Sequence, residues 1–204
     1  MVFQSDPIEN ENEPSREMII KTAKVGDAVV KVVNRCNDAK ETKVLDLSLC
    51  SLIQVPEAVY FILRAAEILK CNLSNNLISK ITPQFGGTCF ANLSSLNVSS
   101  NRLSNLPREL VHCKQLTSVD ISSNNFVEIP NVLLEIETIT DINAKSNFIA
   151  EVNDDEIENH ETLEVVNLEN NPLTTSCHDR LRRINNIRII LSEKKLEEWE
   201  DLSI

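Results

Sequence analysis

Aromatic residues and glycine are scarce in this sequence. Phenylalanine, tryptophan and tyrosine make up 4% of the 204 residues, and the chain has only three glycines. It contains no glycine-rich motif of the kind that cradles a phosphate. Tryptophan and tyrosine, which often anchor tight protein interfaces, occur once each. The sequence therefore favours neither a phosphate-binding loop nor an interface built around large rings.

Basic charge and long apolar runs are also lacking. The chain carries 20 Lys and Arg against 31 Asp and Glu, a formal net charge of −11. Phosphate backbones and anionic bilayers attract clustered cations, so we expect neither nucleic acid nor membrane as a partner. No apolar stretch reaches the roughly 18 residues of a spanning helix. Residues 1–13 are acidic and lack the features of a signal peptide, so we expect a disordered tail.

A repeat of about 23 residues organises the rest of the chain. Between residues 93 and 129, apolar residues recur at relative positions 1, 4, 6, 11 and 14, with asparagine at position 9. Four further copies flank these two. The six position-9 residues are Cys50, Asn76, Asn101, Asn124, Asn147 and Asn171. This pattern is the signature of the leucine-rich repeat.

The repeat predicts an α/β solenoid. Positions 3 to 7 alternate between apolar and polar residues, which is typical of one short strand per repeat. Stacked repeats would form a right-handed superhelix with a parallel sheet on the concave face and short helices on the convex face. The asparagine at position 9 can satisfy backbone groups where the chain leaves the strand. We expect a turn in place of the second convex helix, because Gly86-Gly87 disfavours a helix.

We expect one repeat domain over residues 14–204, with a cap at each end. Residues 14–41 form the N-terminal cap, with a helix from Pro14 to about Asn37, an apolar stripe that includes Val30, and a connection at 34–41. Six repeats fill 42–175. The cap at 176–204 should contain a helix at 177–185, a strand at 187–191 and an amphipathic helix at 192–202 that carries Trp199.

Groups suited to catalysis or metal binding are dispersed. The six cysteines include no CxxC pair, and cysteine and histidine do not recur at metal-ligand spacing. The three histidines fall on predicted convex or terminal segments. The acidic stretch at 151–158 lacks the alternating ligands and central glycine of a calcium loop. We therefore predict no catalytic residue, no metal site and no cofactor.

The concave face is the candidate binding surface, formed mainly by positions 3, 5 and 7. The candidate residues are Asp46, Asn72, Asn97, Asp120, Asn143 and Asn167 at position 5, Ser48, Ser74, Ser99, Ser122, Lys145 and Glu169 at position 7, Lys70, Ser95, Ser118 and Asp141 at position 3, and Arg102 and Phe148 on the rim. The position-5 residues form an unbroken Asn/Asp column. Its members either hydrogen-bond to one another along the sheet or offer polar groups to a partner. A partner could also be gripped at an end, near Tyr60 or Trp199.

The repeat motifs resemble those of a known family. Asn101–Leu110 and Asn124–Pro130 are similar to the typical 23-residue class of intracellular leucine-rich repeats. The short chain, N-terminal helix, six repeats and tail at 187–199 resemble short intracellular members of this family. Extracellular members close their ends with disulfide-rich caps, which this sequence lacks. The resemblance implies a cytoplasmic protein in a reducing compartment.

The repeat pattern and the resemblance together predict a non-enzymatic protein–protein interaction module or scaffold, which we expect to be monomeric. One or more proteins would bind its concave face. The alternative is a regulatory or inhibitory subunit that holds an enzyme on that face. The repeat specifies the fold but not the partner.

Overall fold

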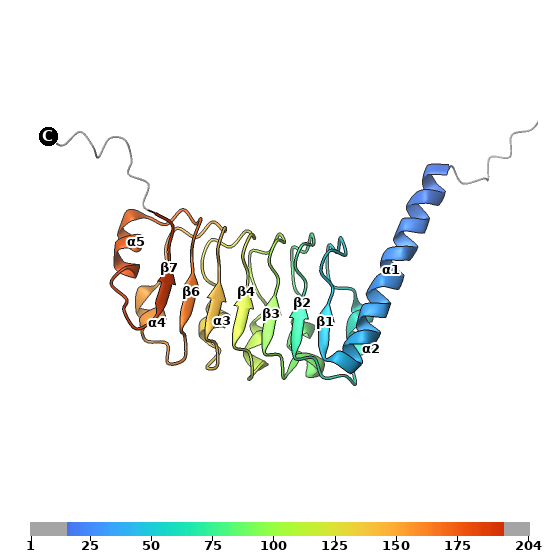
Figure 1. The fold of residues 1–204 in the computed structure, drawn as a ribbon, viewed down its shortest axis with the longest axis horizontal. Coiled ribbons are helices and arrows are strands. Elements are labelled where there is room, and N and C mark those ends of the chain that lie inside the picture. The colour runs from blue at the N-terminus through green and yellow to red at the C-terminus, as the bar shows by residue number, and fades with distance from the viewer. Residues whose placement is uncertain (1–15, 194–204) are drawn as a thin grey trace, which may run out of the picture.

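Seven parallel strands form one sheet in the computed structural model, which describes residues 16–193. Neighbours in the sheet follow the order of the sequence, so each repeat adds one strand beside the previous one (Figure 1). The strands are β1 (Val44–Asp46), β2 (Lys70–Asn72), β3 (Ser95–Asn97), β4 (Ser118–Asp120), β5 (Asp141–Asn143), β6 (Val165–Asn167) and β7 (Arg188–Ile190). The predicted α/β solenoid is confirmed.

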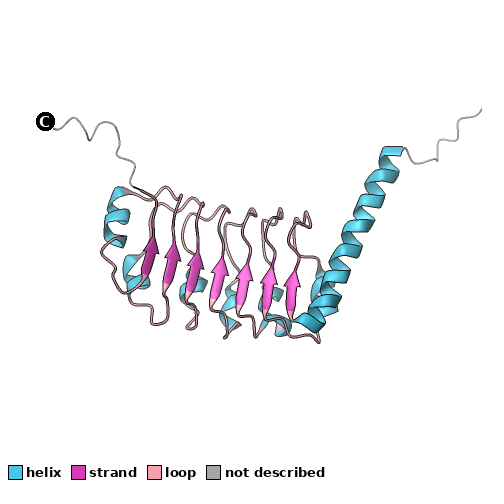
Figure 2. Cartoon of the chain, viewed as in Figure 1, coloured by secondary structure: helices cyan, strands magenta, loops and turns pink. Residues whose placement is uncertain are grey.

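Short helices cover the other side of the sheet (Figure 2). They are the α-helices α2 (Glu57–Leu63), α3 (Asn131–Leu134) and α4 (Asp154–Glu158) and the 3₁₀ helices η1 (Pro83–Gly86), η2 (Thr88–Phe90) and η3 (Arg108–His112). The second repeat has 3₁₀ turns in place of an α-helix, as Gly86-Gly87 predicts. A Cβ atom on Gly86 would lie 2.4 Å from the carbonyl oxygen of Glu109. Glycine therefore allows η1 and η3 to approach closely.

The buried face of α2 differs from the prediction. Each repeat has apolar residues six and three positions before position 1 of the next repeat, and this helical spacing predicts that Ile62 and Ala65 face the convex core of the first repeat. In the structure Val59 and Leu63 are fully buried, whereas Ala65 is exposed. Because α2 is a regular α-helix, its inward residues are four apart. The spacing of six and three residues before position 1 of the next repeat holds better for the tighter convex segments, where Leu110 and Cys113 are buried.

The N-terminal helix α1 (Arg16–Thr42) is longer than predicted. Residues 34–41 are not a connection but its last turns, which pack beside β1. The buried side chains are Val32, Cys36 and Ala39, while Val30 is 57% exposed, so the predicted stripe is wrong at that position. Lys43, with a φ of 59°, ends the helix as its amide donates to the carbonyl oxygen of Ala39.

The C-terminal cap contains α5 (Thr175–Leu181) followed by β7. The predicted helix and strand of this cap are therefore confirmed. The expected helix at 192–202, with Trp199, lies largely outside the described residues, as does the expected disordered tail at 1–13.

Stacked asparagines fasten successive repeats to one another. Asn124 is 4% exposed. Its Nδ2 donates to the carbonyl oxygens of Ile121 (3.0 Å) and Ser122 (3.1 Å) in its own repeat and of Val98 (3.0 Å) in the previous one. Its Oδ1 accepts from the amide of Leu103 at 2.9 Å. One side chain thus satisfies backbone groups from two repeats. Asn76, Asn101, Asn147 and Asn171 make the same kinds of bond. We call these five residues the asparagine ladder.

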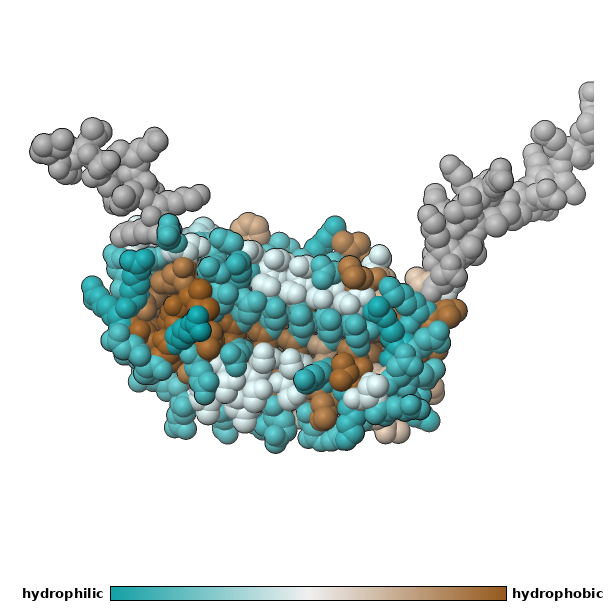
Figure 3. All heavy atoms as spheres, in the orientation of Figure 1, coloured by the Kyte–Doolittle hydropathy of each residue, from teal (hydrophilic) through white to brown (hydrophobic). Residues whose placement is uncertain are grey.

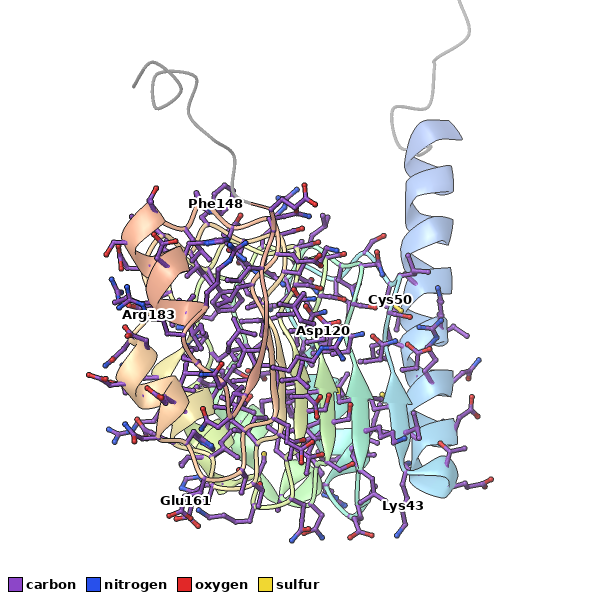
Figure 4. The ribbon with its side chains drawn as sticks, turned by 60° about the vertical axis from the view of Figure 1, so that its left-hand side comes forward. Lys43, Cys50, Asp120, Phe148, Glu161 and Arg183 are labelled. Atoms are coloured by element: carbon purple, nitrogen blue, oxygen red, sulfur yellow. The ribbon has the colours of Figure 1, made fainter. Side chains whose placement is uncertain are left out.

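Helix α1 completes the ladder at the first repeat, where Cys50 replaces asparagine. Arg35 Nη1 donates to the carbonyl oxygen of Ser48 at 2.6 Å, the position-7 carbonyl that an asparagine bonds in the other repeats. Lys31 Nζ donates to the carbonyl oxygen of Leu49 at 3.0 Å. Cys50 lies beside α1 (Figure 4). Arg35 therefore takes over one bond of the missing amide, and Lys31 satisfies a neighbouring carbonyl of the same turn.

We expect Asn124→Ala to lower the free energy of unfolding by about 2–4 kcal/mol, because buried backbone groups lose their partners. Chemical denaturation checks this. Asn125→Ala is the matched control, because Asn125 is the next residue and its side chain is exposed. Equal effects of the two substitutions would contradict a structural role for the ladder.

Candidate functional site

The strand register assembles the predicted concave columns. Position-5 residues pair in sequence from Asp46 with Asn72 to Asn143 with Asn167. The position-3 column runs from Val44 to Val165 in the same way. Asp120 lies on the sheet, whereas Phe148 lies at its upper rim (Figure 4). The structure therefore brings together residues that are about 23 positions apart in the sequence.

The Asn/Asp column is not a lateral hydrogen-bond ladder. Each Oδ1 instead accepts from the backbone amide two residues later, just after its own strand. Examples are Asn72 to Ser74 at 3.0 Å and Asp120 to Ser122 at 2.9 Å. The other four members make the same bond. No hydrogen bond links neighbouring members within residues 16–193. Of the two alternatives for this column, mutual hydrogen bonding along the sheet is therefore not the one observed, because the local amide takes the acceptor first.

Three column side chains keep one polar group toward solvent. The Nδ2 groups of Asn97 and Asn143 and the second carboxylate oxygen of Asp120 have no protein partner in the described part of the chain. All three residues are partly exposed. Since the Oδ1 bond fixes the side chain, these groups are held in place before any partner arrives. Such preorganisation lowers the entropic cost of binding.

Two of the predicted serines contribute little surface. Ser74 is 6% exposed and Ser99 is 9% exposed. Their hydroxyls bond within the turn, since Ser99 Oγ donates to Asn97 Oδ1 at 2.7 Å and Ser74 Oγ accepts from Asn75 Nδ2 at 3.2 Å. Ser74 and Ser99 therefore support the column rather than a partner. Ser48 and Ser122 are partly exposed.

The C-terminal end of the face is chemically different. Lys145 Nζ donates to Glu169 Oε2 at 2.8 Å, across two adjacent repeats. Figure 3 shows a hydrophobic patch over β6 and β7. Val165 and Ile190 occupy concave register positions there, beside Arg188. Sequence reasoning missed Arg188 and Ile190, although extending the register through the predicted strand at 187–191 would have found them.

The rim and end residues divide into exposed and packed groups. Phe148 is 58% exposed, and Arg102 is exposed as well. Tyr60 packs edge-on against Phe90, with ring centroids 6.3 Å apart, and its hydroxyl lies 3.2 Å from the hydroxyl of Thr82. Tyr60 therefore belongs to the convex layer and offers no end grip. Trp199 lies outside the described residues.

The cysteines are poor nucleophiles. All six are free and buried. Burial raises the pKa of the Cys36 and Cys113 thiols to about 11 and also raises the pKa of Cys71 and Cys89. These four residues therefore form few thiolates at neutral pH, and the thiolate is the reactive form. Residues 16–193 also contain no cluster of three histidine, cysteine or acidic side chains placed to hold a metal ion.

The end columns contain carboxylates with shifted pKa values. The pKa of Glu169 lies below its ordinary value of 4.5, mainly because Lys145 donates a hydrogen bond to it and is positively charged. Burial would raise the pKa of Asp46. The hydrogen bonds from Ser48 and the charges of Arg35 and Lys31 outweigh that effect and lower it.

No helix in the described part of the chain is long and apolar enough to cross a bilayer.

We expect Lys145→Met to return the pKa of Glu169 toward its ordinary value, as measured by NMR titration of the carboxyl carbon. Because the folded pKa is depressed, the pair stabilises the fold above about pH 4.5 and loses that contribution as the pH falls through the folded pKa. Lys145→Arg is the control, since it keeps the charge. An unchanged Glu169 pKa in Lys145→Met would contradict the pairing.

Comparison with known proteins agrees with this architecture. A family model described as a leucine rich repeat matches residues 68–126. Leucine-rich repeat-containing protein 20 of Homo sapiens and its counterpart of Mus musculus are each 34% identical over 91 residues. The alignments cover 43% of this chain and 49% of each relative, so the chain spans about half the length of these relatives.

Solved structures share the fold. The leucine-rich repeat domain of the type III effector XopL superposes with a TM-score of 0.62 at 15% identity, over 90% of this chain and 61% of that one. An LRR protein of Leptospira interrogans gives 0.58 at 21% identity, over 68% and 34%. An internalin of Listeria monocytogenes gives 0.52 at 21% identity, over 67% and 38%.

The stacked strands, the asparagine ladder and the solved structures agree on a leucine-rich repeat fold; residues 68–126 match the leucine rich repeat family model, and the chain is similar to leucine-rich repeat-containing protein 20 over part of its length.

Proposed function

We propose that this chain is a protein–protein interaction module whose partner binds across the concave face. The observation that carries the proposal is the column of oriented polar groups on β1 to β6. Every Oδ1 is occupied by its own strand, so the remaining amide and carboxylate groups face outward at regular intervals. Leucine-rich repeat solenoids generally use such extended concave surfaces for binding.

The two zones of the face specify the chemistry of the partner. Over β1 to β4 the partner needs hydrogen-bond donors and acceptors that match two amides and two carboxylates. Over β6 and β7 it meets Val165, which is paired with Arg188, and Ile190, which lies two residues after Arg188 on the same strand. An apolar anchor beside an acidic group would suit this end, because arginine pairs with carboxylates. The scarcity of aromatic side chains favours modest affinity.

We further propose an intracellular, reducing location. The support comes from the cysteines, since all six are free in the structure. Small secreted domains are commonly stabilised by disulfides. This chain stabilises its turns with asparagine amides instead.

An isosteric exchange on the concave face tests the proposal. Asn97→Asp combined with Asp120→Asn keeps both Oδ1 acceptors, the net charge and the side-chain shapes, but inverts the outward-facing groups. We expect the thermal midpoint to change little. Each mismatched hydrogen bond costs about 1–3 kcal/mol. We therefore expect labelling of the partner proteins to fall roughly tenfold or more in the exchange variant. Proximity labelling in cells with the wild-type chain and the exchange variant gives the measurement.

The matched control is the exchange Gln115→Glu with Glu137→Gln, on exposed loop positions that lead into β4 and β5. It should leave labelling unchanged. Equal labelling by the wild type and the concave variant would overturn the assignment to this face. If one enzyme were enriched in stoichiometric amounts, the module would be a regulatory subunit.

A further inference from the structure

An apolar groove runs between α1 and the first repeat, away from the concave face. Helix α1 stands at one end of the sheet with α2 beside it (Figure 1). The upper part of the groove, of about 770 Å³, lies between α1 and residues 49–54, and the lower part, of about 500 Å³, lies between α1 and α2. Val33 and Ile62 line both parts, so the two parts are continuous. The most exposed apolar residues along the groove are Val29 (58%), Leu49 (66%), Ile53 (70%) and Phe61 (67%).

The groove has the length of about three turns of α-helix. The α1 residues that line it run from Ala28 to Lys40, which are 12 positions apart, or about 18 Å at 1.5 Å per residue. Contiguous apolar surface of this extent marks a binding site rather than ordinary surface.

The lining favours a helix as the bound element. Apart from the Cys50 thiol, the polar side chains among the described residues of the upper part are Lys31, Ser51 and Gln54. An extended segment would find few groups there to bond its backbone, whereas a helix bonds its backbone internally. A segment cannot add to the sheet at this end, because α1 packs beside β1.

The charged side chains that line the groove are all cations. They are Lys31, Lys40 and Arg64, and no acidic side chain lines either part among the residues described. Lys31 and Lys40 donate to neutral oxygens of Leu49 and Asn37, and Arg64 lies over the ring of Phe61, 4.6 Å from its centroid. None of the three cations forms a salt bridge within residues 16–193. In a chain of net charge −11, this lining is complementary to carboxylates.

The spacing of the cations matches the length of the groove. Lys31 lines the upper part and Lys40 the lower part, nine positions apart on α1, or about 14 Å. A helix that lies along α1 can therefore place one carboxylate near each end of the groove. Between those ends, apolar residues three and four positions apart form the stripe that a hydrophobic groove accepts.

We propose that this groove is a second docking site, which binds an amphipathic helix of a partner protein with Asp or Glu beside its apolar stripe. The stripe packs on Val29, Ile53 and Phe61. The carboxylates face Lys31 at the upper end and Lys40 and Arg64 at the lower end. Because the groove lies away from the concave face, one chain can hold this helix and a concave-face partner at the same time.

Peptide selection on the full-length chain tests the proposal. The probe is a phage-displayed library of random peptides of about 18 residues, or five helical turns. We expect the enriched peptides to have apolar residues three and four positions apart and more Asp and Glu than Lys and Arg. Their dissociation constants, measured by fluorescence anisotropy, should rise roughly tenfold or more when Ile53→Gln is combined with Phe61→Gln. Val127→Gln is the matched control, because Val127 is equally exposed but lies on the loop after β4.

Charge reversal tests the electrostatic part of the proposal. A selection repeated on the chain with Lys40→Glu and Arg64→Glu should enrich peptides that carry Lys and Arg in place of Asp and Glu. The substituted side chains in all these variants are exposed, so the thermal midpoints should stay close to that of the wild type.

Three results would overturn the proposal. The first is a set of enriched peptides whose affinity does not depend on Ile53 and Phe61. The second is a set that depends on these residues but lacks the helical spacing or the excess of acidic residues. The third comes from sedimentation of the chain alone, since a dimer that Ile53→Gln with Phe61→Gln dissociates would assign the groove to a second copy.

Discussion

The buried asparagine amide is the interaction on which this solenoid depends. At the end of each strand the chain turns outward, and the backbone carbonyls and amides at that turn have no strand partner. Buried groups of this kind are costly when unpaired. A single amide at position 9 donates to carbonyls of its own and the previous repeat and accepts from the previous repeat. The ladder therefore sets both the turn and the distance between repeats.

The polar concave face, which we propose as the binding surface, follows from this arrangement. Because the ladder fixes the register, position-5 residues stand in one row, and the local bond to the amide two residues later orients each of them. The polar surface thus results from the regular stacking of the repeats. Its two ends differ in chemistry from the repeats between them. At the first repeat, cations of α1 replace the missing asparagine. At the last, β7 adds Arg188 and Ile190 to the surface.

The repeat fold could be predicted from the sequence because its signal recurs six times. The row of Asn72, Asn97 and Asp120 could be predicted for the same reason, since register follows from the spacing. Which atoms those side chains bond could not be predicted, because a lateral partner and the amide two residues later fit the same pattern. The buried face of α1 was also misjudged. The residues that pack depend on where the helix crosses β1, and only part of its apolar surface meets the repeats. The groove at Leu49 and Ile53 follows from that crossing, so no sequence pattern indicated it.

Hydrogen exchange of side-chain amide protons tests the central role of the ladder most directly. The chain contains its own comparison, because Asn76, Asn101, Asn124 and Asn147 are buried in the ladder while Asn97 and Asn143 present their amides to solvent. Resolved by NMR, the Nδ2 protons of the ladder residues should exchange far more slowly than those of the two column residues. Equal exchange rates in the two groups would contradict the account, because amides that open freely to water could not hold the repeats together.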